Sequence, residues 1–191
     1  YVRDLRTGAQ AFLGGATNHT SQPAFSADGR YVAYLSVRLP PYALWSGQSP
    51  ANLFRRDLVT DETMLIHSNA VWDSTASTLA ISPDGNRVAF VDRNSLPSGN
   101  GNPNLYMRDV LTGTISLIST QGLLPFSSQN HAGTGASTEP RFSPDGRWLF
   151  FASTASNLAT NYIYSIAQNN LFARDLLNYS TLKVSSIRAP S

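Results

Sequence analysis

Two short cassettes alternate along the chain, and their repetition constrains the fold more than any other feature. The first is built on Ser-Pro-Asp-Gly or Ser-Ala-Asp-Gly between apolar runs, and it occurs at 23–36, 79–91 and 140–153. The second is built on Arg-Asp followed by an apolar residue, and it occurs at 1–13, 52–67, 104–119 and 170–185. Internal repetition of this kind is the signature of a repeat architecture.

The first cassette predicts a β-hairpin. Proline presets φ at the first corner of a type I turn, Asp suits the second corner, and Gly takes the left-handed position that rejoins the strands. The flanking runs are rich in Val, Tyr, Phe and Ile and nearly continuous in apolar character, which is typical of strands covered on both faces. A structural turn role is therefore predicted for three pairs: Asp28 and Gly29, Asp84 and Gly85, and Asp145 and Gly146.

The second cassette also predicts a hairpin, because Asp can accept hydrogen bonds from the turn backbone and Gly can take the corner. Where the glycine is missing, Asp61 and Tyr179 stand near the same place, so those turns should be longer or more strained. A structural turn role is predicted for the aspartates Asp4, Asp57, Asp109 and Asp175, and the same interpretation extends to the adjacent Arg3, Arg56, Arg108 and Arg174.

Two hairpins per unit give four antiparallel strands, A to D, and such units recur in β-propellers. The predicted fold is all-β: a β-propeller of four-stranded antiparallel blades. A C–D hairpin, or half blade, is expected at 1–14, and full blades are expected at 22–67, 76–119 and 139–186. Since propellers typically close with about four to eight blades, we expect the chain to be part of a larger ring. The ring would be completed by further blades of the same polypeptide or by other chains.

The Ser-Pro-Asp-Gly-Arg cassette, the aromatic-aliphatic strand after it and the later Asn-Leu-Phe-x-Arg-Asp-Leu resemble the WD40-like (PD40) repeats of bacterial TolB-like β-propellers. The resemblance covers almost the whole chain and implies a periplasmic or extracellular location. Such repeats occur in scaffolds, in partner-binding domains and beside peptidase domains, so the resemblance selects no single activity. Many relatives carry an acid-rich stretch before strand C, but this chain has asparagines there, at 100–102 and 169–170. The calcium role of acid-rich relatives is therefore not carried over.

Composition excludes several classes of function. A net charge of +2 is too small for a polyanion-binding field, so nucleic acid is not expected as a partner. Apolar runs such as 148–152 fall well short of the roughly 18 residues of a membrane span, so no membrane insertion is expected. The absence of cysteine excludes disulfides, thiolate metal sites and cysteine nucleophiles.

The sequence contains few candidate catalytic or metal-binding residues. Seven of the twelve acidic residues occupy the two repeated turn positions, and the others are scattered: Asp61, Glu62, Asp73, Asp92 and Glu139. The three histidines, His19, His67 and His131, fall in separate repeats with no spacing that pairs them as ligands. The segment 133–137, Gly-Thr-Gly-Ala-Ser, lacks the flanking strand and helix that a phosphate cradle needs. The sequence therefore predicts no catalytic constellation, no metal site and no cofactor.

The strand order places the long B–C and D–A loops at one end of the blades, and loops of this length are usually functional or disordered. Two of them carry aromatic side chains that favour contact: Tyr42 and Trp45 in one, Tyr162 and Tyr164 in the other. An equally weighted interpretation is that these loops fold over the ends of the core.

The leading hypothesis is a non-catalytic scaffold or binding module. It would engage a protein or glycan through the long-loop face or the central funnel. One alternative is the substrate-gating propeller of a serine peptidase whose catalytic domain lies outside this chain. Another alternative is a self-assembling structural subunit.

Overall fold

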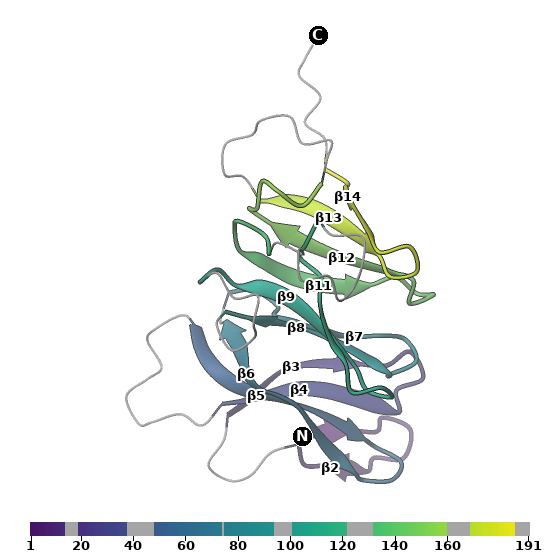
Figure 1. Ribbon diagram of the computed structural model, residues 1–191. Helices are drawn as coiled ribbons and strands as arrows, with labels where there is room; N and C mark the ends of the chain where they lie inside the picture. Colours follow the sequence, from purple (N-terminus) through teal and green to yellow (C-terminus); the bar gives the residue numbers. More distant parts are fainter. Residues whose placement is uncertain are drawn as a thin grey trace.

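The computed structural model describes residues 1–13, 19–37, 48–73, 75–93, 101–121, 132–159 and 169–185. Within these ranges the chain forms three four-stranded antiparallel sheets and one two-stranded hairpin. Figure 1 shows the sheets following one another in chain order, from the hairpin beside the N-terminus to the third sheet near the C-terminus. The predicted fold class, three full blades and one half blade, is confirmed.

Each sheet is a simple up-and-down meander. The half blade consists of β1 (Val2–Arg3) and β2 (Gln10–Ala11). Blade 1 consists of β3 (His19–Phe25), β4 (Tyr31–Val37), β5 (Gln48–Asp57) and β6 (Thr63–Asp73). Blade 2 consists of β7 (Leu79–Ile81), β8 (Arg87–Asp92), β9 (Asn104–Asp109) and β10 (Ile115–Leu117). Blade 3 consists of β11 (Ser137–Phe142), β12 (Trp148–Ser153), β13 (Asn170–Asp175) and β14 (Ser180–Lys183).

The first strands of the blades lie together on the inner side of the stack. Strand β7 contacts both β3 and β11, whereas the fourth strands lie at the opposite edges of their sheets. Strands β3, β7 and β11 are edge strands, each paired with a strand of its own sheet on one side, and β11 also donates hydrogen bonds from the Ser137 and Glu139 N–H groups to the Pro103 and Ser77 carbonyls of blade 2. This arrangement directs three strand edges toward the space where the axis of a ring would run.

The core consists of apolar side chains packed between neighbouring sheets. Leu35 of blade 1 belongs to one buried cluster with Val88 and Phe90 of blade 2, and Val91 of blade 2 belongs to another with Phe151 of blade 3. Full burial of such side chains contributes about 1.5–3 kcal/mol each. Among the described residues, no helix is long and apolar enough to cross a membrane.

The second strands show which sheet faces are covered. In β4 and β8 every residue after the first is buried, as expected for strands covered on both faces. In β12 burial alternates: Leu149 and Phe151 are buried, whereas Trp148 and Phe150 are only half-buried. Leu171 and Leu182 in the neighbouring strands are exposed. One face of blade 3 is therefore uncovered among the described residues, and that face is apolar.

Candidate functional site

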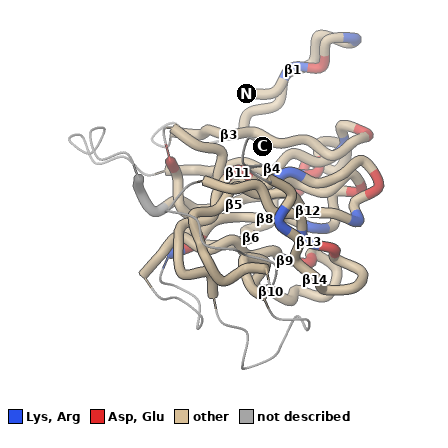
Figure 2. Tube along the Cα trace, turned by 90° about the horizontal axis from the view of Figure 1, so that it is seen from above, with Lys and Arg blue, Asp and Glu red and all other residues tan. Residues whose placement is uncertain are grey.

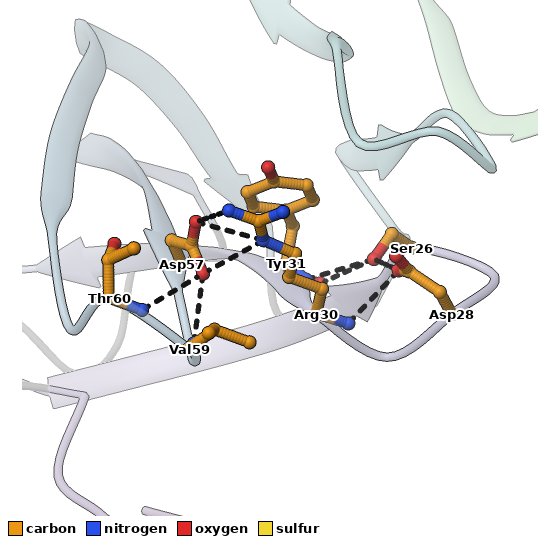
Figure 3. Close-up of polar contacts among 7 residues, drawn as sticks. All are labelled: Ser26, Asp28, Arg30, Tyr31, Asp57, Val59 and Thr60. Atoms are coloured by element: carbon orange, nitrogen blue, oxygen red, sulfur yellow. Dashed lines mark hydrogen bonds and ion pairs between the residues drawn. The ribbon is translucent and has the colours of Figure 1, made fainter.

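The Asp-Gly turns are held by their own aspartates. In blade 1, Asp28 accepts hydrogen bonds from the Ser26 hydroxyl at 2.6 Å and from the Arg30 backbone N–H at 3.0 Å (Figure 3). The corresponding bonds recur at Asp84 and Asp145. The carboxylates are thus engaged with the turn backbone rather than directed at a shared reaction centre.

The Arg-Asp turns use their aspartates in the same way. Asp57 accepts from the backbone N–H groups of Val59 and Thr60, at 2.9 and 3.3 Å. Equivalent pairs of N–H groups donate to the aspartate of the other three copies, Asp4, Asp109 and Asp175. Where the corner glycine is missing, Asp61 and Tyr179 adopt positive φ values of 66° and 54°, which is the backbone strain that the sequence predicted.

An arginine–aspartate clasp joins the two turns of blade 1. The guanidinium of Arg30 meets the carboxylate of Asp57, with Nη2 2.7 Å from Oδ2 (Figure 3). Arg147 and Asp175 form the same clasp in blade 3, also at 2.7 Å. In each clasp the arginine holds the pKa of the aspartate well below its usual range. Blade 2 has Asn86 at the arginine position, so it lacks the ion pair.

Charges of both signs alternate along these turn ends (Figure 2). The clasps neutralise many of them locally, so the turn ends do not form a surface of one sign. At this end of the blades, the charged side chains of the clasps and turns are therefore engaged in holding the turns, and we do not place the candidate site there.

Two of the arginines next to the repeated aspartates tie their blade to the preceding one, whereas Arg56 bonds within blade 1, to the Thr63 hydroxyl and the Asp61 carboxylate. Arg108 donates from Nη1 to the Ile66 carbonyl of blade 1 at 2.7 Å. Arg174 donates from Nη1 to the Thr120 carbonyl at 3.4 Å, across the interface between blades 2 and 3. The sequence interpretation assigned these arginines to turn chemistry, whereas Arg108 and Arg174 contact the preceding blade.

A groove of about 860 Å³ runs along the inner strands of all three blades. It begins at the connection between β6 and β7 and extends to the Asp-Gly turns. Its apolar wall includes Phe25, which is 47% exposed, together with the half-buried Trp72 and Phe142. Asp73 and Arg141 are the charged residues in its lining.

On one side of this groove, the Gln22 side chain connects β3 to the segment between β6 and β7 through hydrogen bonds. Its side-chain nitrogen Nε2 donates to the carbonyls of Asp73 and Ala76 at 2.8 and 3.1 Å, and its Oε1 accepts from the Thr78 backbone N–H at 2.8 Å. Gln22 has φ 53° at a break in the β3–β4 register, and Glu139 repeats that conformation in β11 with φ 57°. Sequence reasoning missed this bridge; the Gln-Pro and Glu-Pro pairs before the cassette coincide with the two breaks in register but do not indicate the contacts across them.

Some predicted site residues lie outside the described residues. These are the loop aromatics Tyr42, Trp45, Tyr162 and Tyr164, together with His131. The long-loop binding face therefore stays a prediction.

The two described histidines occupy separate places. His19 meets Trp72 edge-on, with 6.3 Å between ring centroids. His67 lies 2.5 Å from a carboxylate oxygen of Asp92 and stacks on Phe90, in the interior between blades 1 and 2. The described part of the chain contains no group of three or more His, Asp or Glu side chains placed to hold a metal ion.

No family model matches the sequence, and no curated protein matches it. Solved structures match the fold closely enough to classify it. TolB from Acinetobacter baumannii is 20% identical with a TM-score of 0.54, over 88% of this chain and 33% of TolB. An oligogalacturonate lyase in complex with manganese is 16% identical with a TM-score of 0.62, over 98% of this chain and 47% of the lyase. The β-propeller domain of the Trilobed protease from Pyrococcus furiosus is 14% identical with a TM-score of 0.54, over 90% of this chain and 44% of that domain's chain.

These likenesses, together with the three four-stranded blades, define the chain as a β-propeller segment. More specifically, the fold is TolB-like, as the cassettes predicted. The chain spans from a third to about half the length of these three structures. At such identities the likeness establishes the fold and leaves activity to other arguments.

Proposed function

We propose that the chain belongs to a non-catalytic β-propeller that binds a protein or glycan partner through the groove along β3, β7 and β11. The observation that carries the proposal is the groove itself, about 860 Å³ and walled by all three blades. Ligand sites are typically concave, mostly apolar and roughly 300–1,000 Å³, with a few placed polar groups. The groove has this character.

The geometry favours an extended protein segment over a glycan. Strands β3, β7 and β11 are sheet edges, and an extended peptide recognises a strand edge through main-chain hydrogen bonds. Phe25, Trp72 and Phe142 offer apolar contact for alternate side chains of such a peptide. Arg141 is exposed at the same wall, with Nη1 3.1 Å from the Ser77 hydroxyl, and can receive a carboxylate.

The non-catalytic part of the proposal rests on the engagement of the repeated acids. The repeated aspartates accept hydrogen bonds within their own turns, and the His67–Asp92 pair is buried between blades, away from the groove lining. A periplasmic or extracellular location, implied by the family resemblance, is part of the same proposal.

The uncovered face of blade 3 supports a second kind of partner. Phe150 corresponds to Ala33 of blade 1 and Ala89 of blade 2, and both of these alanines are fully buried against the next blade. We therefore propose that a further blade, from the same polypeptide or another chain, packs on the Phe150 face. A substrate-gating role beside a peptidase domain is a further candidate, favoured by the likeness to the propeller of the Trilobed protease.

Selection from a phage-displayed library of random peptides tests the groove. The enriched peptides are then measured by fluorescence polarisation against the wild-type chain and two variants. We expect Phe25→Asp to weaken binding about tenfold or more, since burying a charge against an apolar contact costs at least 1.4 kcal/mol. Leu111→Asp, at a turn tip that is 77% exposed and outside the groove lining, is the matched control and should bind as the wild type does.

Peptides that bind Phe25→Asp as tightly as the wild type would refute the groove as the binding site. A library that yields no peptide would refute the protein-binding proposal. Binding to a glycan array alone, lost in Phe25→Asp, would refute the peptide preference and support the glycan form of the proposal.

A further inference from the structure

A second cavity, of about 300 Å³, lies between blades 2 and 3, away from the inner-strand groove. One wall is formed by β8, β9 and β10 of blade 2, and the other by β13 and the turn that follows it. We call it the interblade crevice. Its lining contains two arginines, Arg87 and Arg174, one acid, Asp109, and the hydroxyl-bearing side chains Thr112, Thr114, Ser116 and Tyr179.

Arg174 is the largest fully buried side chain of the described chain and is only 1% exposed. Its Nη1 donates to the Thr181 hydroxyl at 2.9 Å and to the Thr120 carbonyl, but its Nε has no hydrogen-bond partner. Burial lowers the pKa of Arg174 to about 10. A buried guanidinium is costly unless an anion pairs with it.

No described carboxylate pairs with Arg174. The adjacent Asp175 is held by the Arg147 guanidinium and by the N–H groups of its own turn. An Nε without a partner also occurs at Arg56 and Arg108, the same repeat position in blades 1 and 2, so that feature does not by itself mark a ligand site. Arg174 differs from the arginines at the same position of the other blades because it is fully buried and also lines a cavity.

Arg87 brings a second guanidinium to the crevice. Blades 1 and 3 have aromatic residues at this position, Tyr31 and Trp148. Arg87 uses Nη1 to donate to the Gly146 carbonyl of blade 3 at 3.3 Å. The acid of the lining, Asp109, accepts hydrogen bonds from the N–H groups of its own turn. Two cations and one anion leave the crevice with an excess positive charge.

We propose that the interblade crevice binds an oxyanion, the carboxylate or phosphate group of a small ligand, between Arg87 and Arg174. A guanidinium matches the geometry of a carboxylate or phosphate and bonds it through two N–H groups. The hydroxyls of Thr114 and Ser116 on the blade 2 wall and of Tyr179 on the blade 3 wall supply further donors. A volume of about 300 Å³ admits one small ligand.

The site is independent of the inner-strand groove, and its occupation has a physical consequence that can be measured. Because the two arginines belong to different blades, a bound anion joins blade 2 to blade 3. A ligand that binds only the folded chain raises its stability in a saturable way that depends on ligand concentration.

Thermal unfolding in sodium phosphate, in sodium acetate and in sodium chloride at matched ionic strength tests the proposal, with titration calorimetry for the dissociation constant. We expect a saturable rise in melting temperature with phosphate or acetate beyond that with chloride. Arg87→Gln, at a half-buried position, should raise the dissociation constant about tenfold. Arg6→Gln, an exposed arginine of the half blade, makes the same change in net charge and should leave the constant unchanged.

Arg108→Gln is a second control, because it removes an arginine tie between blades and its side chain is not part of the crevice lining. It should lower stability without changing anion affinity. A response to phosphate alone supports a phosphorylated ligand, and a response to acetate alone supports a carboxylate. No response beyond chloride, or an equal response in Arg87→Gln, would overturn the proposal.

Discussion

Gly85 lies where the Asp-Gly turn of blade 2 meets blade 1. Its φ is +74°, and a Cβ added there would lie 2.2 Å from Cδ2 of Tyr31. The Arg55 guanidinium also stacks on the Tyr31 ring, 3.6 Å from the ring centroid. The ring therefore has little room to move away. Gly29, the equivalent residue of blade 1, has nearly the same φ, +71°, but no heavy atom within 4 Å of its added Cβ.

Alanine substitutions at the two glycines distinguish the cost of backbone strain from the cost of packing. Gly29→Ala should cost about 1 kcal/mol, the penalty of a left-handed backbone for an L-residue. Gly85→Ala should cost this amount plus about 1–3 kcal/mol for overpacking against Tyr31. For a chain of this size, a destabilisation of 1 kcal/mol lowers the melting temperature by about 2–4 °C. We therefore expect losses of about 3 °C for Gly29→Ala and about 6–12 °C for Gly85→Ala.

Urea denaturation of both variants, with a double-mutant cycle through Tyr31→Ala, measures the packing part directly. In the Tyr31→Ala background, Gly85→Ala should cost only about as much as Gly29→Ala, which gives a coupling free energy of about 1–3 kcal/mol. Equal costs of the two glycine substitutions, or a coupling near zero, would refute close packing between blades 1 and 2 at this turn.

Three further predictions concern contacts within and between blades. Gln22→Ala, which removes three hydrogen bonds to backbone atoms between blades, should cost about 2–3 kcal/mol in urea denaturation, and an unchanged midpoint would contradict the bridge. Asp92→Ala, which removes the carboxylate beside His67, should cost about 3 kcal/mol by the same assay, whereas a loss below 1 kcal/mol would show that the pair adds little. The Arg30 clasp depresses the pKa of its aspartate, so it stabilises the fold above about pH 4, and this stability is lost as the pH falls. Arg30→Gln should therefore flatten the dependence of the urea midpoint on pH between about pH 5 and pH 2, and an unchanged slope would argue against the clasp.

The sequence predicted the turns well because turn chemistry is local. Asp28 and Asp57 bond N–H groups two or three residues further along, and such contacts can be read from a short motif. The contacts between blades could not be read in this way. Gln22 bonds Thr78, 56 residues away, and Arg108 bonds Ile66, 42 residues away. Apart from the Thr78 hydroxyl, their partners are backbone atoms, which do not depend on the identity of the residue that provides them.

The repeat pattern also gave no indication of the groove. Phe25 and Phe142 stand in the first cassette, where nearly continuous apolar character predicts burial on both faces. In the structure these phenylalanines lie on inner edge strands, where one side faces the groove. An apolar residue on a strand covered by two sheets and one on a groove wall look alike in sequence. Only the arrangement of the three inner strands separates them.

Blade 2 departs from its neighbours at two consecutive positions, and the departures have one physical effect. Asn86 replaces the arginine of the clasp, and Arg87 replaces the aromatic residue that follows it. In blades 1 and 3 the arginine lies at the turn and neutralises the aspartate of the same blade. In blade 2 the positive charge has moved one residue along the strand, so it faces blade 3 in the same crevice as the buried Arg174. A shift that gives up an ion pair and places two guanidiniums at one interface, with Asp109 as the single described carboxylate, lowers stability unless a further anion joins them. For this reason the interblade crevice, and not the repeated turns, is where blade 2 has become specialised.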